Sequence, residues 1–585
     1  MKCIYRGCLC VLTFSLPLLA AGTNTPPPRN IFETSLHHDL RSDILPARTR
    51  PDPFPASPPD NIEPCRVTGT VAWVTLTNTF QDPQLGGQLR ALYAFDANTI
   101  RKRPVIVGAG MLIDQLRAWA ADGTAAGNAG DLYDNRDRGH ARLDLGPYPQ
   151  ITSVSYAQEA VAAGLDYGVQ ARLLHDAVTI GNSSTARTQG PFWRSLPRIA
   201  MLEAPGATWL YIQYRANQIY LYPSHHDYDP EPDGHGDVFP ANTPYILASH
   251  GSSYSEQPFL NALSMTLAAF RPEVKQRLAA SGQLMPALQM VFRRSNRMVT
   301  NDSVYLTGIA HPPVFDSTQL DLEGMLRLAH DLSLTNLPPL VELKVVSEDR
   351  FTAGRDYFDV ADRGEGLFTT PCANARVWRA TARTRRMVVS AAGSHAPDRR
   401  PLTYHWSVLC GDPAAVLIVP RTSDASIVEI TFTWQARHPV CSGSSLQSSR
   451  IEIGAFASNG SLWSAPAFIS FTTLNNEKRE YAADGRILSV TYVGGEEAGP
   501  YVDPVYDLPK SWRDDYHYDA GGKLSGWTRL RGFEKKRSDD YTSDGRRILT
   551  RDVSGQSART TAVRYISHQA SSNLAQTLKE LEVHE

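Results

Sequence analysis

The densest group of side chains suited to metal binding lies in one short acidic segment. Residues 225–237 read His-His-Asp-Tyr-Asp-Pro-Glu-Pro-Asp-Gly-His-Gly-Asp. Hard cations take several oxygen ligands, and carboxylates spaced along a loop bent by glycine supply them. The candidate ligands are Asp227, Asp229, Asp233, His235 and Asp237. The segment predicts a Ca²⁺ site, and its alternative is a solvated, turn-rich acidic loop.

Two features of this segment separate it from an EF-hand. Pro230-Glu231-Pro232 inserts extra residues between the acidic positions, and no glutamate stands at the twelfth loop position. The imidazoles of His225, His226 and His235 offer a second possibility, because mixed imidazole and carboxylate ligands suit Zn²⁺ or another transition metal. Ca²⁺ stays ahead of Zn²⁺ because oxygen ligands predominate.

A second polar cluster combines carboxylates, guanidinium groups and an imidazole within ten residues. Residues 131–140 read Asp-Leu-Tyr-Asp-Asn-Arg-Asp-Arg-Gly-His. A carboxylate and an imidazole that face a cleft perform acid–base chemistry on a sugar or an ester. Asp134, Asp137 and His140 are the candidate catalytic residues, and Arg136 is a candidate clamp for an anionic group. The alternative is a network of surface ion pairs.

Two serine-rich turns invite comparison with hydrolase nucleophiles. They span residues 179–185 and 249–253, and neither contains the Gly-x-Ser-x-Gly pattern of a nucleophile elbow. Gly181, Asn182 and Ser183 are predicted to present backbone N–H groups to an anion. The alternative is a loop capped by hydroxyl side chains. The sequence also lacks a phosphate-binding loop and the His-Glu-x-x-His motif of zinc proteases.

Composition narrows the class of protein and its partners. The 585 residues carry a formal net charge of −2, which provides no field to attract nucleic acid or an anionic membrane. With 42% hydrophobic and 20% charged residues, the chain is typical of folded proteins rather than disordered ones. We therefore expect no nucleic-acid partner.

The first 22 residues have the pattern of a secretory signal. Lys2 and Arg6 precede an apolar stretch over 11–19, and Ala20-Ala21-Gly22 supplies the small residues of a cleavage site. The apolar stretch is shorter than the roughly 20 residues of a membrane span. The pattern predicts a secreted, periplasmic or cell-surface protein with no membrane span. The alternative is an uncleaved N-terminus that tethers the chain.

Cysteine usage agrees with an oxidising compartment. Beyond the signal-like segment the cysteines are Cys65, Cys372, Cys410 and Cys441. We expect Cys410 to pair with Cys441 inside one β-domain, which leaves Cys65 to pair with Cys372. The alternative is four free thiols. No Cys-x-x-Cys spacing indicates a zinc or redox site.

The amino-acid composition and the hydrophobic pattern divide the chain into segments. Residues 23–64 are a proline-rich linker, and 65–348 mix helix and strand patterns as an α+β domain. Expected strands cover 67–76, 209–214 and 218–222, and expected helices cover 157–164, 260–271 and 321–332. No family is recognisable in this domain.

Residues 377–475 have the alternation and the Asn459-Gly460 turn of a small β-sandwich. Within them, Ser390–Trp406 ends in Pro-Leu-Thr-Tyr-His-Trp and resembles the polycystic-kidney-disease (PKD) type of extracellular module. The Gly-Asp-Gly turn of that family is replaced by Cys410-Gly411-Asp412-Pro413, which indicates a divergent member. The resemblance implies a spacer or binding module.

Three segments after residue 476 repeat a tyrosine, a glycine-containing turn and a basic-aliphatic strand. They begin at Tyr481, Tyr518 and Tyr541 and resemble the YD repeats of secreted β-hairpin proteins, which implies carbohydrate or surface contact. Ordinary Asp-Gly hairpins are the alternative. We assign 476–557 to these hairpins and 558–585 to a tail with a helix over 573–584.

The sequence therefore predicts an α+β chain with a large mixed domain, a β-sandwich and a hairpin region. The expected function is an extracellular or surface protein that binds glycan or another extracellular polymer. The alternative is an extracellular hydrolase of polysaccharides or esters, with its catalytic residues in 65–348 and accessory binding modules after them.

The cation site predicts that Ca²⁺ stabilises the protein. A ligand bound only by the folded state raises the midpoint of thermal unfolding. We expect EDTA to lower the midpoint of the full chain and excess Ca²⁺ to restore it, as measured by differential scanning fluorimetry. An unchanged midpoint in both conditions would contradict a structural Ca²⁺ site.

Overall fold

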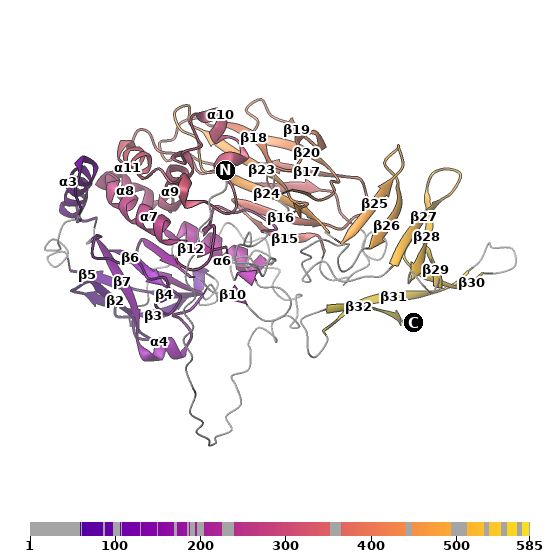
Figure 1. Cartoon of the computed structure of the whole chain (residues 1–585), viewed down its shortest axis with the longest axis horizontal. Helices are drawn as coiled ribbons and strands as arrows, with labels where there is room; N and C mark the ends of the chain where they lie inside the picture. The colour runs from indigo at the N-terminus through magenta and orange to yellow at the C-terminus, as the bar shows by residue number, and fades with distance from the viewer. Residues whose placement is uncertain are drawn as a thin grey trace, which may run out of the picture. The chain divides into compact units, whose positions relative to one another are not determined.

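A six-stranded parallel sheet organises the first part of the chain in the computed structural model (Figure 1). Its spatial order is β13-β12-β9-β6-β7-β2, and every pairing is parallel. The strands are β2 (Val71–Val74), β6 (Asp131–Asn135), β7 (Ile151–Tyr156), β9 (Thr179–Asn182), β12 (Gln218–Pro223) and β13 (Ile246–Ser249).

The structure describes residues 59, 61–85, 88–96, 106, 108–128, 130–148, 150–168, 172–183, 186–187, 194–195, 204–224, 239–351, 364–439, 447–474, 476–492, 512–531, 537–551, 558–569 and 576–583. The expected signal segment and most of the proline-rich linker lie outside these residues.

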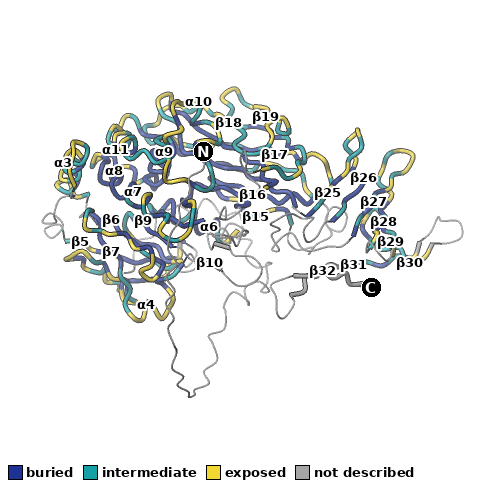
Figure 2. The backbone as a smooth tube through the Cα atoms, viewed as in Figure 1, coloured by how far each residue is buried: buried dark blue, intermediate teal, exposed yellow. Residues whose placement is uncertain are grey.

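Most strands of this sheet are buried over most or all of their length (Figure 2). Every residue of β9, β12 and β13 is buried, and so are the first four of β6. Parallel sheets are normally covered on both faces, so their strands lack the alternation of a half-exposed strand. For this reason the serine- and glycine-containing β9 segment resembled a turn in sequence.

Helices form a cluster beside the sheet (Figure 1). α7 contacts α3, α9 and α11, and it also contacts β9. Their bounds are α3 (Met111–Ala125), α4 (Gln158–Ala162), α6 (Ala204–Arg215), α7 (Gln257–Ala269), α8 (Pro272–Ala280), α9 (Leu284–Arg294), α10 (Asp302–Tyr305) and α11 (Leu322–Asp331).

The helices expected over 157–164, 260–271 and 321–332 are confirmed as α4, α7 and α11. The strand expected over 209–214 is wrong, because these residues belong to α6. Trp209, Leu210, Gln213 and Tyr214 are the buried positions, and their spacing is that of one helix face. The aromatic residues of this segment favour a strand by local preference, but packing of one face against the core stabilises a helix.

Smaller sheets flank the parallel one. β1 (Cys65–Val67) pairs in parallel with β5 (Tyr93–Phe95), and β10 (Ala186–Arg187) pairs with β11 (Arg194–Ser195). A three-stranded sheet contains β3 (Thr79–Asp82), β4 (Gln88–Ala91) and β8 (Leu173–His175). The strand expected over 67–76 is therefore split between β1 and β2.

Two larger sheets follow between residues 344 and 473. One has the order β14-β17-β20-β19, and the other has the order β15-β16-β24-β23-β18. Phe432 of the first sheet and Phe471 of the second lie with ring centroids 4.3 Å apart, so the two sheets share a core. The strands are β14 (Lys344–Glu348), β15 (Gly366–Thr370), β16 (Ala373–Trp378), β17 (Thr384–Ser390), β18 (Thr403–Cys410), β19 (Val416–Pro420), β20 (Ile427–Thr433), β23 (Ile451–Ser458) and β24 (Ala467–Thr473).

These sheets begin before residue 377, because β14 and β15 contribute an edge strand to each. Their core is continuous with that of the parallel-sheet region. The Tyr245 hydroxyl lies 2.6 Å from the Thr370 hydroxyl, and the Asn242 side-chain amide donates to Glu452 at 3.1 Å. The resemblance to PKD modules stays a prediction.

The cysteines depart from the expected pairing. Cys65 lies in β1, Cys372 lies in the turn between β15 and β16, and both are free thiols. They belong to different hydrophobic clusters, and the Cys372 thiol donates to the carbonyl of Val341 at 3.3 Å. The expected Cys65–Cys372 bond is therefore not formed. Cys410 is also free among the described residues, and Cys441 lies outside them.

The last part of the chain forms an antiparallel meander in which β25 to β32 pair in sequence order. Each Tyr-Gly motif spans a hairpin turn, at Gly485, Gly522 and Gly545, and all three glycines have positive φ. The YD resemblance stays a prediction. The strands are β25 (Glu477–Tyr481), β26 (Ile487–Tyr492), β27 (Trp512–Tyr518), β28 (Leu524–Arg531), β29 (Arg537–Thr542), β30 (Arg547–Arg551), β31 (Ala558–Gln569) and β32 (Gln576–Val583).

The helix expected over 573–584 is wrong. Gln576–Val583 forms β32, which pairs with β31 over eight residue pairs. Pairing with a neighbouring strand overrides the helix preference of this Leu- and Glu-containing segment. None of the helices that the structure describes is both long and apolar enough to cross a membrane.

Gly181 tests the close packing of the parallel sheet. A β-carbon there would lie 2.3 Å from the Tyr220 ring and 2.4 Å from the Asp134 carbonyl oxygen. We expect Gly181→Ala to lower the free energy of unfolding by about 2 kcal/mol or more, because overpacking a rigid core typically costs that much. Chemical denaturation of the full chain measures the change.

The matched control is Gly366→Ala, whose new methyl group would meet no atom within 4 Å. We expect the free energy of unfolding of this variant to stay within about 0.5 kcal/mol of the parent's, or to be slightly higher. The reason is that glycine in a strand loses more backbone conformational entropy on folding than alanine does. Equal effects of the two substitutions would contradict the close approach of Tyr220 to β9.

Candidate functional site

The carboxyl ends of the central strands bring polar residues together at one edge of the parallel sheet. β6 ends at Asn135 and is followed by Arg136 and Asp137, and β9 ends at Asn182 and is followed by Ser183. Ser224 follows β12, and Ser249 is the last residue of β13. In open α/β sheets, ligands bind outside the carboxyl ends of the strands. We therefore take this edge as the candidate site.

Asp134 lies just below the edge, in a fully buried hydrogen-bond network. Its Oδ2 accepts from Arg136 Nε at 2.7 Å, His175 Nε2 at 3.0 Å and the Tyr220 hydroxyl at 2.6 Å. Its Oδ1 accepts from the Tyr156 hydroxyl at 2.7 Å. These partners come from β7, β8, β12 and the residue that follows β6, so one carboxylate connects several strands.

The charge state of this network follows from its contacts. Burial alone would raise the pKa of Asp134, but the Arg136 charge and the His175 contact outweigh burial and hold that pKa well below its usual value. Burial lowers the pKa of His175, so its imidazole is neutral near pH 7. The neutral ring donates from Nε2 to Asp134 and accepts at Nδ1 from the Tyr93 hydroxyl, at 2.8 Å.

This geometry assigns Asp134 and Arg136 a structural role. Arg136 also donates to the Leu173 carbonyl at 2.7 Å, and its guanidinium lies 4.8 Å from the centre of the Tyr220 ring. Its exposed fraction is 1%, so the guanidinium is not presented to an external anion. The expectation of an acid–base role for Asp134 and of an anion clamp for Arg136 is replaced by a buried ion pair.

Asp137 and His140 lie together in the loop that follows β6. His140 Nδ1 lies 3.1 Å from Asp137 Oδ2, and about half of the His140 side chain is exposed. The Asn135 side-chain oxygen shapes the turn by accepting the backbone N–H of Asp137 at 2.9 Å and that of Gly139 at 3.3 Å. Tyr254 packs edge-on against the imidazole, with centroids 5.1 Å apart.

Glu256 is a second carboxyl group at the edge that sequence reasoning missed. It precedes the first residue of α7 without a side-chain capping hydrogen bond, it is fully buried, and its Oε1 accepts from Asn182 Nδ2 at 3.4 Å. Its Oε2 has no hydrogen-bond partner among the described residues. Burial raises the pKa of Glu256, and the charge of Asp137 raises it further. The two carboxyl groups are thus close enough to interact.

Gly181, Asn182 and Ser183 are engaged in the parallel sheet. Gly181 and Asn182 are in β9, which is paired on one side with β6 and on the other with β12. The Ser183 N–H donates to the Leu221 carbonyl at 3.0 Å. The Asn182 side-chain oxygen accepts from the Tyr133 hydroxyl at 2.5 Å. The sheet engages backbone groups of this segment, and the expected anion site stays a prediction.

Three residues around the edge have a left-handed backbone although none is glycine. Arg138, Ala141 and Tyr254 have φ values of 51°, 50° and 78°. Such residues cost free energy and persist where the surrounding structure holds them. Arg138 is held by Asp166 at 3.4 Å and by the Tyr167 ring, whose centroid lies 4.7 Å away. Strain therefore gathers in the loops that carry Asp137, His140 and Glu256.

The metal ligands expected in the acidic segment cannot be placed. Asp227, Asp229, Asp233, His235 and Asp237 lie outside the described residues. Within the part of the chain that the structure describes, no group of three or more His, Cys, Asp or Glu side chains is arranged to hold a metal ion. The Ca²⁺ site stays a prediction.

Comparison with known proteins identifies no family for this chain. No family model matches the chain, and no curated protein matches it. One similar solved structure is a nucleoside hydrolase-related hypothetical protein from Saccharophagus degradans that is associated with carbohydrate metabolism. The match has 14% identity and a TM-score of 0.17, and it covers 55% of this chain and 66% of that one. A likeness at this TM-score carries no argument about fold or activity.

The Asp134 network predicts a large loss of stability in Asp134→Asn. The substitution leaves the buried Arg136 charge without a carboxylate, and breaking such a pair typically costs about 3–5 kcal/mol. The cost should be present above pH 4 and should shrink as pH falls further. The reason is that the unfolded aspartate takes up its proton near a pKa of roughly 3.9, whereas the folded one resists it. Urea unfolding between pH 7 and pH 3 measures both effects.

Asp114→Asn is the control, because Asp114 forms an exposed pair with Arg117 at 2.6 Å. Exposed pairs of this kind contribute about 0–1 kcal/mol. A cost for Asp134→Asn no greater than that of the control, or one that does not change with pH, would contradict the role of Asp134.

Proposed function

We propose that this chain is an extracellular hydrolase that cleaves a glycosidic bond at the carboxyl edge of its parallel sheet. The observation that carries the proposal is Glu256, a buried carboxyl group with a raised pKa and one oxygen without a partner among the described residues. The charge of Asp137 contributes to that raised pKa, after burial. Glycoside hydrolysis uses two carboxyl groups, one protonated and one ionised.

The two carboxyl groups take complementary roles in this proposal. Burial raises the pKa of Glu256 and so favours its acid form, which gives its proton to the leaving glycosidic oxygen as the carbon–oxygen bond breaks. Asp137, paired with His140 at 3.1 Å, accepts a proton from the attacking water. Water is consumed, and the products are a sugar with a new anomeric hydroxyl and an alcohol. Asn182 orients Glu256 through its 3.4 Å contact.

Side chains around these groups suit a substrate rich in hydroxyls. Asn135, Ser224 and Ser249 provide amide and hydroxyl groups at the edge. Tyr254 adds a ring that is 57% exposed beside His140. An exposed aromatic ring next to polar groups is a common contact surface for amphipathic ligands. The secretory pattern of residues 1–22 supports an extracellular substrate, and the PKD-like and hairpin regions would act as accessory binding units.

Binding without turnover is the second candidate. It is favoured by the complete burial of Asn182, Ser224 and Glu256, since a substrate reaches these groups only if the edge opens. In this alternative the exposed Tyr254 ring and the half-exposed His140 side chain hold a glycan or another extracellular polymer. Measuring sugar release separately from retention on the polymer distinguishes the two functions.

Glu256→Gln predicts a loss of hydrolysis in a folded protein. The amide keeps the shape of the side chain but gives no proton, and general acids contribute roughly 10²- to 10⁴-fold. We expect sugar release from a panel of polysaccharides to fall at least 100-fold, with the unfolding midpoint preserved. The matched control is Glu159→Gln on the exposed face of α4, which we expect to leave release unchanged.

The pH profile adds a readout that a structural role would not move. Because Glu256 acts in its protonated form, the parent should lose activity as pH rises through the raised pKa of this residue. The residual activity of Glu256→Gln should lack this alkaline limb. Full activity in Glu256→Gln, or an unchanged alkaline limb, contradicts the proposal.

A further inference from the structure

Glu256 and its neighbours are enclosed in this structure. The exposed fraction of Glu256, Asn182 and Ser224 is 0%. A glycosidic bond reaches the Glu256 carboxyl group only when a segment that covers the edge moves aside. Residues 250–255 are that segment, because they join Ser249 at the end of β13 to the start of α7 and lead directly into Glu256.

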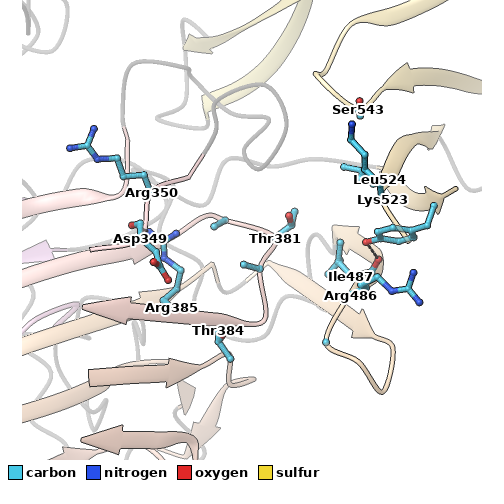
Figure 3. A pocket seen from close by; sticks show the side chains of 14 residues that line it. Asp349, Arg350, Thr381, Thr384, Arg385, Arg486, Ile487, Lys523, Leu524 and Ser543 are labelled. Atoms are coloured by element: carbon cyan, nitrogen blue, oxygen red, sulfur yellow. Dashed lines mark hydrogen bonds between the residues drawn. The ribbon is translucent and has the colours of Figure 1, made fainter. Parts of the chain in front are cut away.

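Two cavities in the described part of the chain provide no route to this carboxyl group. The larger one, of about 640 Å³, is lined by parts of residues 349–385 and of the hairpin meander, with Arg385 and Lys523 among the lining side chains (Figure 3). The smaller one, of about 310 Å³, has Asn217 in its lining. Neither lining includes Glu256. Access to the candidate site therefore depends on the segment that covers it.

Residues 250–255 have little packing of their own. None of them is buried, whereas every residue of β13 and most residues of α7 are buried. Segments with few buried apolar contacts open locally at a small cost in free energy, while the elements that flank them stay folded. The contrast in burial therefore confines the movement to this segment.

The backbone of this segment bends sharply at two positions. Gly251 and Tyr254 have φ values of 122° and 78°. A tyrosine in this region costs free energy and persists only where its surroundings hold it. Gly251 donates its N–H to Ser224 Oγ at 3.3 Å, and a β-carbon on it would lie 3.2 Å from that of Ser255. The closed segment is thus folded back on itself, with strain at Tyr254 that opening releases.

A pair of hydroxyl groups and a pair of rings hold the segment closed. The Ser255 and Ser249 hydroxyl oxygens are 2.7 Å apart, next to β13. The Tyr254 ring packs edge-on against His140, with ring centroids 5.1 Å apart. The Tyr254 and His140 side chains are both about half exposed, so water replaces their contact when the segment moves.

We propose that residues 250–255 are a lid, which opens to admit a saccharide and closes over it during hydrolysis. This inference rests on the proposed function, because it assigns the segment that uncovers Glu256. Opening separates Tyr254 from His140 and exposes the Glu256 carboxyl group. Closure returns Glu256 to a site from which bulk water is excluded, and electrostatic interactions are stronger there.

A disulfide bond across the lid tests this inference in the full chain. Ser249→Cys with Ser255→Cys places two thiols where the hydroxyl oxygens are 2.7 Å apart, and the sulfur atoms of a disulfide lie about 2.0 Å apart. The oxidised bond, verified by mass spectrometry, pins the lid to the end of β13, and a reductant frees it. We expect amide hydrogen–deuterium exchange over 250–256 to be at least tenfold slower in the oxidised form than in the reduced form.

Tyr254→Ala is the converse variant and does not depend on disulfide formation. It removes the ring contact with His140 and so favours the open lid. We expect exchange over 250–256 to be at least threefold faster than in the parent. The matched control for the disulfide is Ser255→Cys alone, whose exchange should be the same with and without reductant.

Sugar release from the panel of polysaccharides is measured on the same samples. We expect at least tenfold less release by the oxidised double variant than by its reduced form. Equal exchange in the two forms, equal release by the two forms, or unchanged exchange in Tyr254→Ala would overturn the lid. Slower exchange in the oxidised form, together with no release even by the parent, would support the opening of residues 250–255 and contradict the proposed hydrolysis.

Discussion

The buried carboxylate of Asp134 is the interaction on which the candidate site depends. It accepts hydrogen bonds from Arg136, His175, Tyr156 and Tyr220, which ties β6 to its neighbours immediately below the carboxyl edge. An ion pair with this many donors satisfies the charge that burial would otherwise penalise. The close approach of Tyr220 also explains glycine at position 181, since any β-carbon there would collide with the ring.

The parallel topology of the sheet places functional groups next to the buried Asp134 network. Because the central strands run in one direction, the residues that follow them meet at a single edge, where Asp137, His140 and Glu256 gather. Asp134 and Asp137 are only three residues apart, yet their environments separate their roles. Asp134 is fully enclosed by donors, whereas Asp137 shares its carboxylate with a half-exposed imidazole. Environment, rather than residue type, distinguishes the structural acid from the candidate catalytic one.

Local patterns predicted those features that local contacts determine. The helices α4, α7 and α11 depend on short spacings, and these predictions were correct. The predictions of a strand over 209–214 and of a helix over 573–584 were wrong. Contacts with distant parts of the chain determine the conformations of these segments, which form α6 and β32. The mixture of helices and sheets was expected, but the parallel order of the first sheet was not.

Glu256 shows why the rest of the candidate site could not be predicted from the sequence. Its neighbours Asn182 and Asp137 are 74 and 119 positions away in the chain, and no local motif marks the residue. A serine-rich turn that ends a buried strand and leads into a helix was the available signal. The burial that raises the pKa of this carboxyl group arises only when α7 docks beside β9.

Hydrolysis of a glycan in ¹⁸O-labelled water tests the central claim most directly. The full chain would be incubated with a panel of polysaccharides, and soluble products would be analysed by mass spectrometry. The account predicts released sugars whose new reducing end carries one ¹⁸O atom, and at least 100-fold less release by Glu256→Gln. Retention of the protein on a polymer with no soluble, labelled sugar would contradict hydrolysis and leave binding as the function of the edge.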